Sequence, residues 1–181
     1  FVKNSAIHGN YLAYANDDLI EIDGGQQNVL VYDNELIQGY TGISIAPNLL
    51  GPSYLFHNFI HNLGDDRGKE WTAIKAGGLM SKPAGQTFIF ENFIDVQRNG
   101  IAASKVVGDS TFWVNTKNNI IITQNTGSSV GYCIFDKEKF IEIIPEICSE
   151  FEIEELGDCL ESLALGLLYY TGYDVQHSEE L

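Results

Sequence analysis

The sequence predicts an all-β fold, a right-handed parallel β-helix in which short strands stack as the coils of a solenoid, followed by a short α-helical C-terminal segment. Three observations predict it. A phrase of alternating apolar residues that ends in Asn recurs along the chain, its spacing is uneven, and apolar residues change to helical spacing from about residue 137. An uneven repeat fits coils of variable length whose extra residues lie in loops.

The recurring phrase occurs at least five times, with steps of 24 to 34 residues between successive Asn residues. Its copies end at Asn4, Asn34, Asn58, Asn92 and Asn125. Gly-led strands such as residues 42–45 follow, so each unit offers two or three short strands. Asn tolerates left-handed backbone angles and can turn the chain, and its amide can bond the Asn one coil above, about 4.8 Å away. A β-sandwich also gives short strands between turns, and it is the alternative fold.

Residues 137–181 differ from the rest of the chain. Phe140, Ile141, Ile144 and Ile147 recur at helical spacing, and a second apolar stretch follows Gly157. We expect two helices that either cap the solenoid or begin a separate module, because an uncovered last coil exposes strand edges. The chain therefore divides into coils at residues 1–136 and a helical segment at residues 137–181.

Composition excludes some classes of partner. With 25 acidic and 10 basic residues among 181, the net charge of −15 repels phosphate backbones, so we expect no nucleic acid. The excess acid serves either solubility or the binding of divalent cations. No apolar run reaches the eighteen residues or so of a membrane span, and three cysteines leave the redox compartment open. The chain starts without Met or a signal-peptide core, and we expect a fragment or processed product.

Residues 1–136 resemble the right-handed β-helix proteins of the pectate-lyase-like superfamily. The repeated Asn phrase carries the resemblance, together with the acidic segment at residues 16–25 and the phrase Ala73-Ile74-Lys75-Ala76-Gly77-Gly78. The resemblance implies a secreted or cell-surface protein that acts on acidic polysaccharide. The fold itself hosts lyases, hydrolases, epimerases, adhesins and spacers, so activity depends on the site.

The densest acidic cluster contains Asp17, Asp18, Glu21 and Asp23. Glu21 and Asp23 are two residues apart and share one face of a strand. Carboxylates at this density repel one another unless a cation intervenes, and Ca²⁺ accepts six to eight oxygen ligands. We therefore expect Ca²⁺ as a cofactor, and the resemblance to calcium-dependent pectate lyases implies that Asp17, Asp18 and Glu21 are ligands.

Lys75 is the candidate catalytic base. In the lyases that the chain resembles, a Lys in a similar phrase removes the proton beside the uronate carboxylate, while calcium neutralises that carboxylate. This chain departs from the pattern because a coil that contains Asn58 lies between the acids and Lys75, a separation of about 10 Å for two coil steps. The alternative is that the acids form turns and Lys75 is a surface charge.

Other residues are candidates for contacts with a sugar chain. We expect substrate to be bound by the side chains of Arg98, His57, His61 and Trp71. A metal site at the two histidines is disfavoured, because no third ligand is near them in sequence.

Two further functions stay open. A glycoside hydrolase would use paired acids, from the cluster or from Asp65 and Asp66. A non-catalytic carbohydrate-binding or spacer module of a larger protein needs neither. The oligomeric state is not predicted.

Overall fold

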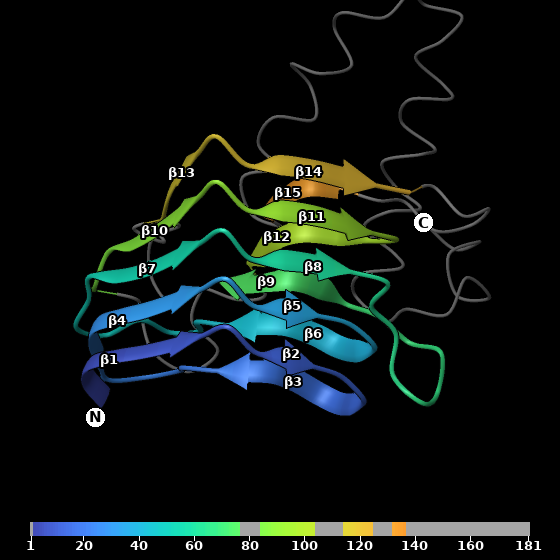
Figure 1. Ribbon diagram of the computed structural model, residues 1–181. Coiled ribbons are helices and arrows are strands. Elements are labelled where there is room, and N and C mark those ends of the chain that lie inside the picture. Colours follow the sequence, from blue (N-terminus) through green and yellow to red (C-terminus); the bar gives the residue numbers. More distant parts are fainter. Residues whose placement is uncertain (1, 77–83, 104–113, 125–131, 137–181) are drawn as a thin grey trace, which may run out of the picture.

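The computed structural model describes residues 2–76, 84–103, 114–124 and 132–136, and these form a parallel β-solenoid (Figure 1). Within them, fifteen short strands make three sheets of five, and each coil gives one strand to each sheet. Every pairing is parallel, which excludes the β-sandwich alternative. The predicted fold class is confirmed. The predicted C-terminal helices and the boundary at residue 137 lie outside the described residues.

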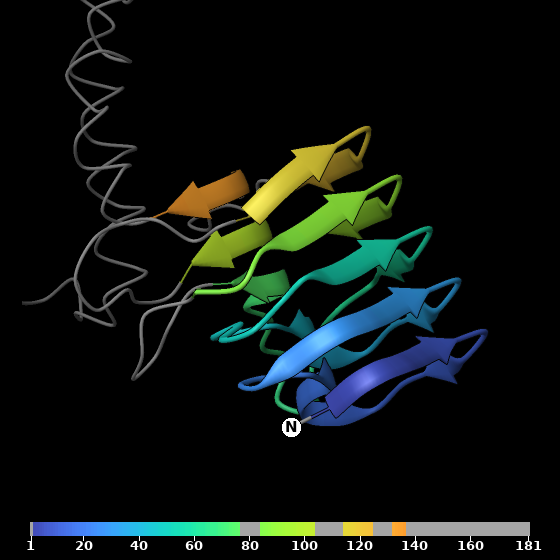
Figure 2. The ribbon, with the colours of Figure 1, turned by 90° about the vertical axis from the view of Figure 1, so that its left-hand side faces the viewer.

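The three sheets form the faces of the solenoid, and Figure 2 shows their coils stacked one above another. Sheet A contains β1 (Val2–His8), β4 (Gln26–Tyr32), β7 (Ser53–Phe56), β10 (Thr87–Phe90) and β13 (Val114–Lys117). Sheet B contains β2 (Tyr11–Leu12), β5 (Glu35–Leu36), β8 (Phe59–His61), β11 (Phe93–Val96) and β14 (Ile120–Thr123). Sheet C contains β3 (Ala15–Glu21), β6 (Gly39–Ser44), β9 (Thr72–Ala76), β12 (Asn99–Ala103) and β15 (Tyr132–Asp136). No helix among the described residues is long and apolar enough to cross a bilayer.

The core consists of aligned columns of aliphatic side chains. Because side chains alternate between the two faces of a strand, one inward residue of each strand lies directly above its partner in the coil below. Each column contains one residue from each successive coil, and its side chains are nearly or fully buried. The columns are Val31, Leu55 and Ile89 in sheet A, Leu36, Ile60 and Ile94 in sheet B, and Ile20, Ile43, Ile74 and Ile101 in sheet C.

A ladder of Asn side chains runs along the turn between sheets A and B. Each side-chain Nδ2 donates to the Oδ1 of the Asn one coil above, at 2.9 Å, through Asn10, Asn34, Asn58, Asn92 and Asn119. The predicted ladder is confirmed at its three middle members. The first copy was aligned wrongly, since Asn4 lies on β1 and instead accepts from Asn28. The last copy was also aligned wrongly, because β14 follows the ladder Asn, and Asn125 lies outside the described residues.

The expectation that the ladder Asn itself turns the chain is wrong. The left-handed backbone angle falls on the residue before each ladder Asn, with φ between 53° and 66° at Gly9, Asp33, His57, Glu91 and Asn118. The three middle ladder residues, Asn34, Asn58 and Asn92, are buried in the interior turn, so their amide bonds rather than their backbone freedom explain the recurrence of Asn. The outward residue before it takes the strained angle and varies in type.

Candidate functional site

The candidate site lies on the outer side of sheet C. Strand register places Glu21 beside Ser44, and Ser44 beside Lys75, in a column that crosses β3, β6 and β9. Ser44 and Lys75 each follow a fully buried Ile, so alternation directs both away from the core. We call Glu21, Ser44 and Lys75 the Lys75 column.

Lys75 forms an ion pair with Asp18 across the intervening strand. Its Nζ lies 2.6 Å from Asp18 Oδ2, and the two side chains are only 12% and 4% exposed. The expected separation of two coils is therefore bridged by the lysine stem, which passes β6 where Ser44 offers a small side chain. Buried charges are found in proteins when they are paired, so this contact holds both groups in place.

An irregularity in β3 brings Asp18 to this position. The register of β3 against β6 shifts between Ala15 and Asp18, as in a β-bulge. Bulges redirect side chains and increase local twist. Asp17, the neighbour of Asp18, is exposed on the same strand.

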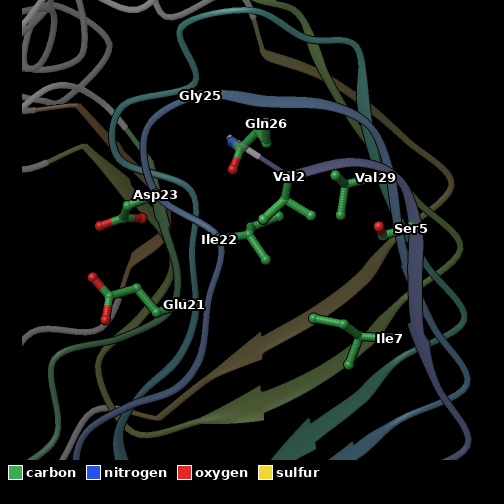
Figure 3. Close-up of a pocket in the computed structure, with 9 residues that line it drawn as sticks. All are labelled: Val2, Ser5, Ile7, Glu21, Ile22, Asp23, Gly25, Gln26 and Val29. Atoms are coloured by element: carbon green, nitrogen blue, oxygen red, sulfur yellow. The ribbon is translucent and has the colours of Figure 1, made fainter.

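Three acids gather beside Lys75. One ligand oxygen from each of Asp18, Glu21 and Asp23 lies within 4.8 Å of the others, so this group can hold a metal ion. Figure 3 shows Glu21 and Asp23 on the outer side of the ribbon, opposite the inward Ile22. Among the four acids singled out in the sequence, Asp17 is the one that this group does not include.

Two of these acids have distinct polar environments. Asp23 Oδ1 accepts hydrogen bonds from Ser44 Oγ at 2.5 Å and from the backbone N–H of Ala46 at 2.7 Å. Burial raises the pKa of Asp23, and these two bonds offset only part of that effect. Asp18 Oδ1 is buried and has no hydrogen-bond partner among the described residues, so it is an acceptor that a cation can satisfy.

Sequence reasoning missed Ser44 and Ala46 as part of the site. The alternation of residues 42–45 places Ser44 opposite the inward Ile43, but only the register of β3 against β6 shows which acid it meets. No signal in the sequence marks the Ala46 amide as a donor.

Two predicted substrate contacts lie on sheet C, away from the acids. Trp71 directly precedes β9 and Arg98 directly precedes β12, and these strands are neighbours. Trp71 is four residues before Lys75, about 13 Å along an extended strand. The backbone N–H of Arg98 donates to Glu70 Oε1 at 2.9 Å, and this bond joins the segment before β12 to the segment before β9.

The two histidines lie on other parts of the solenoid and belong to separate contacts. His57 occupies the exposed turn before the ladder, where Nε2 is 2.8 Å from Glu91 Oε2. His61 lies on β8, where it stacks on Phe59 at 3.8 Å and Nε2 is 3.1 Å from Glu35 Oε1. The structure therefore does not bring His57 and His61 to the acidic cluster.

The second acid pair, Asp65 and Asp66, stabilises a loop. Asp65 accepts from the backbone N–H groups of Arg67 and Lys69 at 2.9 Å and also binds the Arg67 guanidinium. Desolvation favours a higher pKa for Asp65, but these bonds together outweigh it and lower the pKa. A carboxyl group whose pKa is lowered is poorly suited to donate a proton in hydrolysis.

Aromatic side chains on the outer face of sheet A stack on one another. Ring centroids lie 4.6 to 5.1 Å apart, with planes within 5°, through His8, Tyr32, Phe56 and Phe90. The faces of the inner rings are thus occupied by their neighbours, and their edges are left for solvent. A sugar platform requires a free ring face, so this column is better explained as a stabilising stack.

A cavity of about 210 Å³ lies at the first coil (Figure 3). Val2, Ile7, Ile22 and Val29 give it an apolar wall, and the acids border it only through Glu21 and Asp23. The cavity lies at the N-terminal end of the core, and Lys75 is not among the residues that line it.

Comparisons of this chain with protein-family models, with curated proteins and with solved structures found no match.

Proposed function

We propose that this chain is the β-helix of a calcium-assisted lyase that cleaves a uronate-containing polysaccharide by β-elimination. One observation carries the proposal: Lys75 on β9 lies beside Asp18, which forms a group with Glu21 and Asp23 on and just after β3, two coils away. Calcium-assisted β-elimination uses a cation at the uronate carboxylate and a general base beside the proton that is removed. The β-helix fold is compatible with this activity, although it hosts others as well.

The acids and Lys75 have different roles in the proposed reaction. Asp18, Glu21 and Asp23 supply carboxylate oxygens of the kind that calcium prefers, and the buried Oδ1 of Asp18 has no other partner among the described residues. Bound calcium would neutralise the uronate carboxylate and so acidify the C5 proton. The unprotonated Lys75 amine accepts that proton. The C–H electron pair forms the C4=C5 double bond, the C4–O bond breaks, and the leaving oxygen takes a proton from water.

Lys75 cannot act as a base while its ammonium is held at 2.6 Å from Asp18. The proposed reaction therefore requires the ion pair to open when cation and substrate bind, and the released ammonium to give one proton to solvent before the amine accepts the C5 proton. Trp71 and Arg98, about 13 Å along sheet C from Lys75, are placed to contact more distant units of a sugar chain.

The test combines calorimetric titration of calcium with absorbance of unsaturated uronate ends on a panel of acidic polysaccharides. We compare the wild type with Asp18→Asn, which keeps the side-chain shape but removes the charge. Asp66→Asn is the matched control, because it removes an exposed acid outside the cluster. The expected result is calcium binding and new absorbance in the wild type and the control, both lost in Asp18→Asn. Calcium binding equal in all three proteins would refute the assigned ligands.

A retaining glycoside hydrolase is the second candidate, favoured by the raised pKa of Asp23 beside Glu21. A carboxyl group with a raised pKa is suited to protonate a leaving group, and a close pair of acids fits a retaining rather than an inverting geometry. New reducing ends without ultraviolet absorbance would support it. Neither product on any polysaccharide would favour a non-catalytic binding or spacer module.

A further inference from the structure

Lys75 shares the carboxylate of Asp18 with the group of acids that can hold a metal ion. Its ammonium satisfies Asp18 Oδ2 beside a cluster whose other charged members, within the part of the chain that the structure describes, are the acids Glu21 and Asp23. When all four groups are ionised, three carboxylates and one ammonium leave two negative charges, which one divalent cation neutralises. The pair is shielded from water, since the lysine side chain is 12% exposed and the aspartate 4%.

Two cations this close oppose one another. A divalent ion bound to Asp18, Glu21 and Asp23 lies a few ångströms from Nζ if Lys75 stays in place. Low local polarity makes that repulsion stronger than it would be in water. Coupling between two binding events is reciprocal, so whatever Lys75 costs the metal ion, the metal ion costs the Lys75 ion pair.

We infer that Lys75 is a tethered competitor for the calcium site, and that calcium binding releases the Lys75 amine from Asp18. The inference rests on the proposed function and deepens it, because it describes how the cation frees the Lys75 side chain from its partner. Without calcium, Lys75 neutralises the buried Asp18 and stays unavailable. With calcium, Asp18 becomes a metal ligand and the lysine stem is free to turn toward the substrate.

A purely structural role for Lys75 predicts the opposite sign. If the ion pair only held Asp18 in position for the metal, removal of the ammonium would leave the carboxylate poorly placed and weaken calcium binding. If Lys75 competes, removal strengthens calcium binding. The direction of the change in affinity therefore separates the two roles.

The first experiment is calorimetric titration of calcium into the wild type, Lys75→Met and Lys69→Met. Methionine keeps the length and apolar character of the stem, and Lys69 is an exposed lysine that makes a matched control for charge. We expect Lys75→Met to bind calcium about tenfold more tightly and Lys69→Met to change little. Equal or weaker binding by Lys75→Met would overturn the inference and leave the calcium site standing. Absence of binding in all three proteins would remove both the site and the inference.

A second measurement avoids variants that fold poorly. Wild-type protein is acetylated with acetic anhydride with and without calcium at matched ionic strength, and modification of each lysine is followed by peptide mass spectrometry. Calcium is expected to raise the acetylation rate of Lys75 about fivefold or more while Lys69 in the same sample stays constant. An unchanged or slower rate at Lys75 would show that calcium does not release the amine.

Discussion

Replacement of Asn58 by Ala should destabilise the solenoid far more than the same replacement of Asn10. Asn58 Oδ1 accepts from the backbone N–H and the Nδ2 of Asn34, at 3.3 and 2.9 Å. Its own Nδ2 donates to Val31 O and to Asn92 Oδ1, both at 2.9 Å. Asn58 is 1% exposed, so water cannot replace these four bonds.

The loss of stability depends on how many buried hydrogen-bonding groups each replacement leaves without a partner. Four buried hydrogen bonds at about 1 kcal/mol each give a loss of roughly 4 kcal/mol in the free energy of unfolding. Asn10 is exposed at the lower end of the ladder, where water can solvate the groups that lose a partner. We expect its replacement to cost about 1 kcal/mol. A typical domain has about 5 to 15 kcal/mol of stability, so Asn58→Ala removes a large share.

Urea unfolding followed by far-ultraviolet circular dichroism measures both variants against the wild type. We expect the urea midpoint of Asn58→Ala to fall well below that of Asn10→Ala, with an unchanged slope. Equal midpoints would show that the interior Asn side chains contribute no more than a solvated one. Our account of why Asn recurs in the sequence would then be refuted.

Three further substitutions test the calcium ligands, the packing of β6 against β9 and the buried carboxyl group of Glu70. By calorimetry, Asp17→Asn should leave the calcium affinity within about twofold of the wild type, whereas Asp18→Asn should abolish calcium binding. A strong loss of affinity in Asp17→Asn would show that Asp17 is a calcium ligand after all. Gly42→Ala should cost about 1 to 3 kcal/mol in urea unfolding, because the added Cβ would lie 2.4 Å from Ala73 O; a neutral result would show that β6 and β9 shift apart easily. Burial raises the pKa of Glu70 in the folded protein above its usual 4.5, so the unfolded chain loses this proton at a lower pH than the folded protein. The stability of the wild type relative to Glu70→Gln should therefore fall as the pH rises from 4.5 through the raised pKa of the folded protein. A difference independent of pH in parallel urea titrations would contradict that last expectation.

The fold was predictable because its repeat is visible in short sequence patterns. Alternation of apolar residues and the recurring Asn are visible without any knowledge of pairing, and both survive in the structure at Asn34, Asn58 and Asn92. The end copies failed for the same reason. Asn4 also follows an alternating run, and only strand register shows that it pairs with Asn28 instead of joining the ladder.

The site was predictable only in part. Local density marked the acids, but the irregularity in β3 that separates Asp18 from Asp17 has no sequence signal. The contact between Asp18 and Lys75 joins residues 57 positions apart. It depends on the register of two strand pairs and on the small Ser44 between them, and neither follows from the spacing of motifs.

Outer columns of this solenoid differ in a way that bears on function. In a parallel stack each position faces its counterpart in the next coil, so identical apolar, aromatic or amide groups in register stabilise one another, as the rings of Tyr32, Phe56 and Phe90 do. The Lys75 column breaks this rule, because an acid, a small hydroxyl residue and a base follow one another across three coils. The polar contacts that this mixture makes are the Lys75–Asp18 ion pair and the hydrogen bond from Ser44 to Asp23, and both lead to the acidic cluster. Local departures from the pattern that stabilises a fold are expected at functional sites. The departure here coincides with a buried oxygen of Asp18 that has no hydrogen-bond partner among the described residues, and this coincidence is the reason to look for a cation and its substrate on sheet C rather than on the aromatic face.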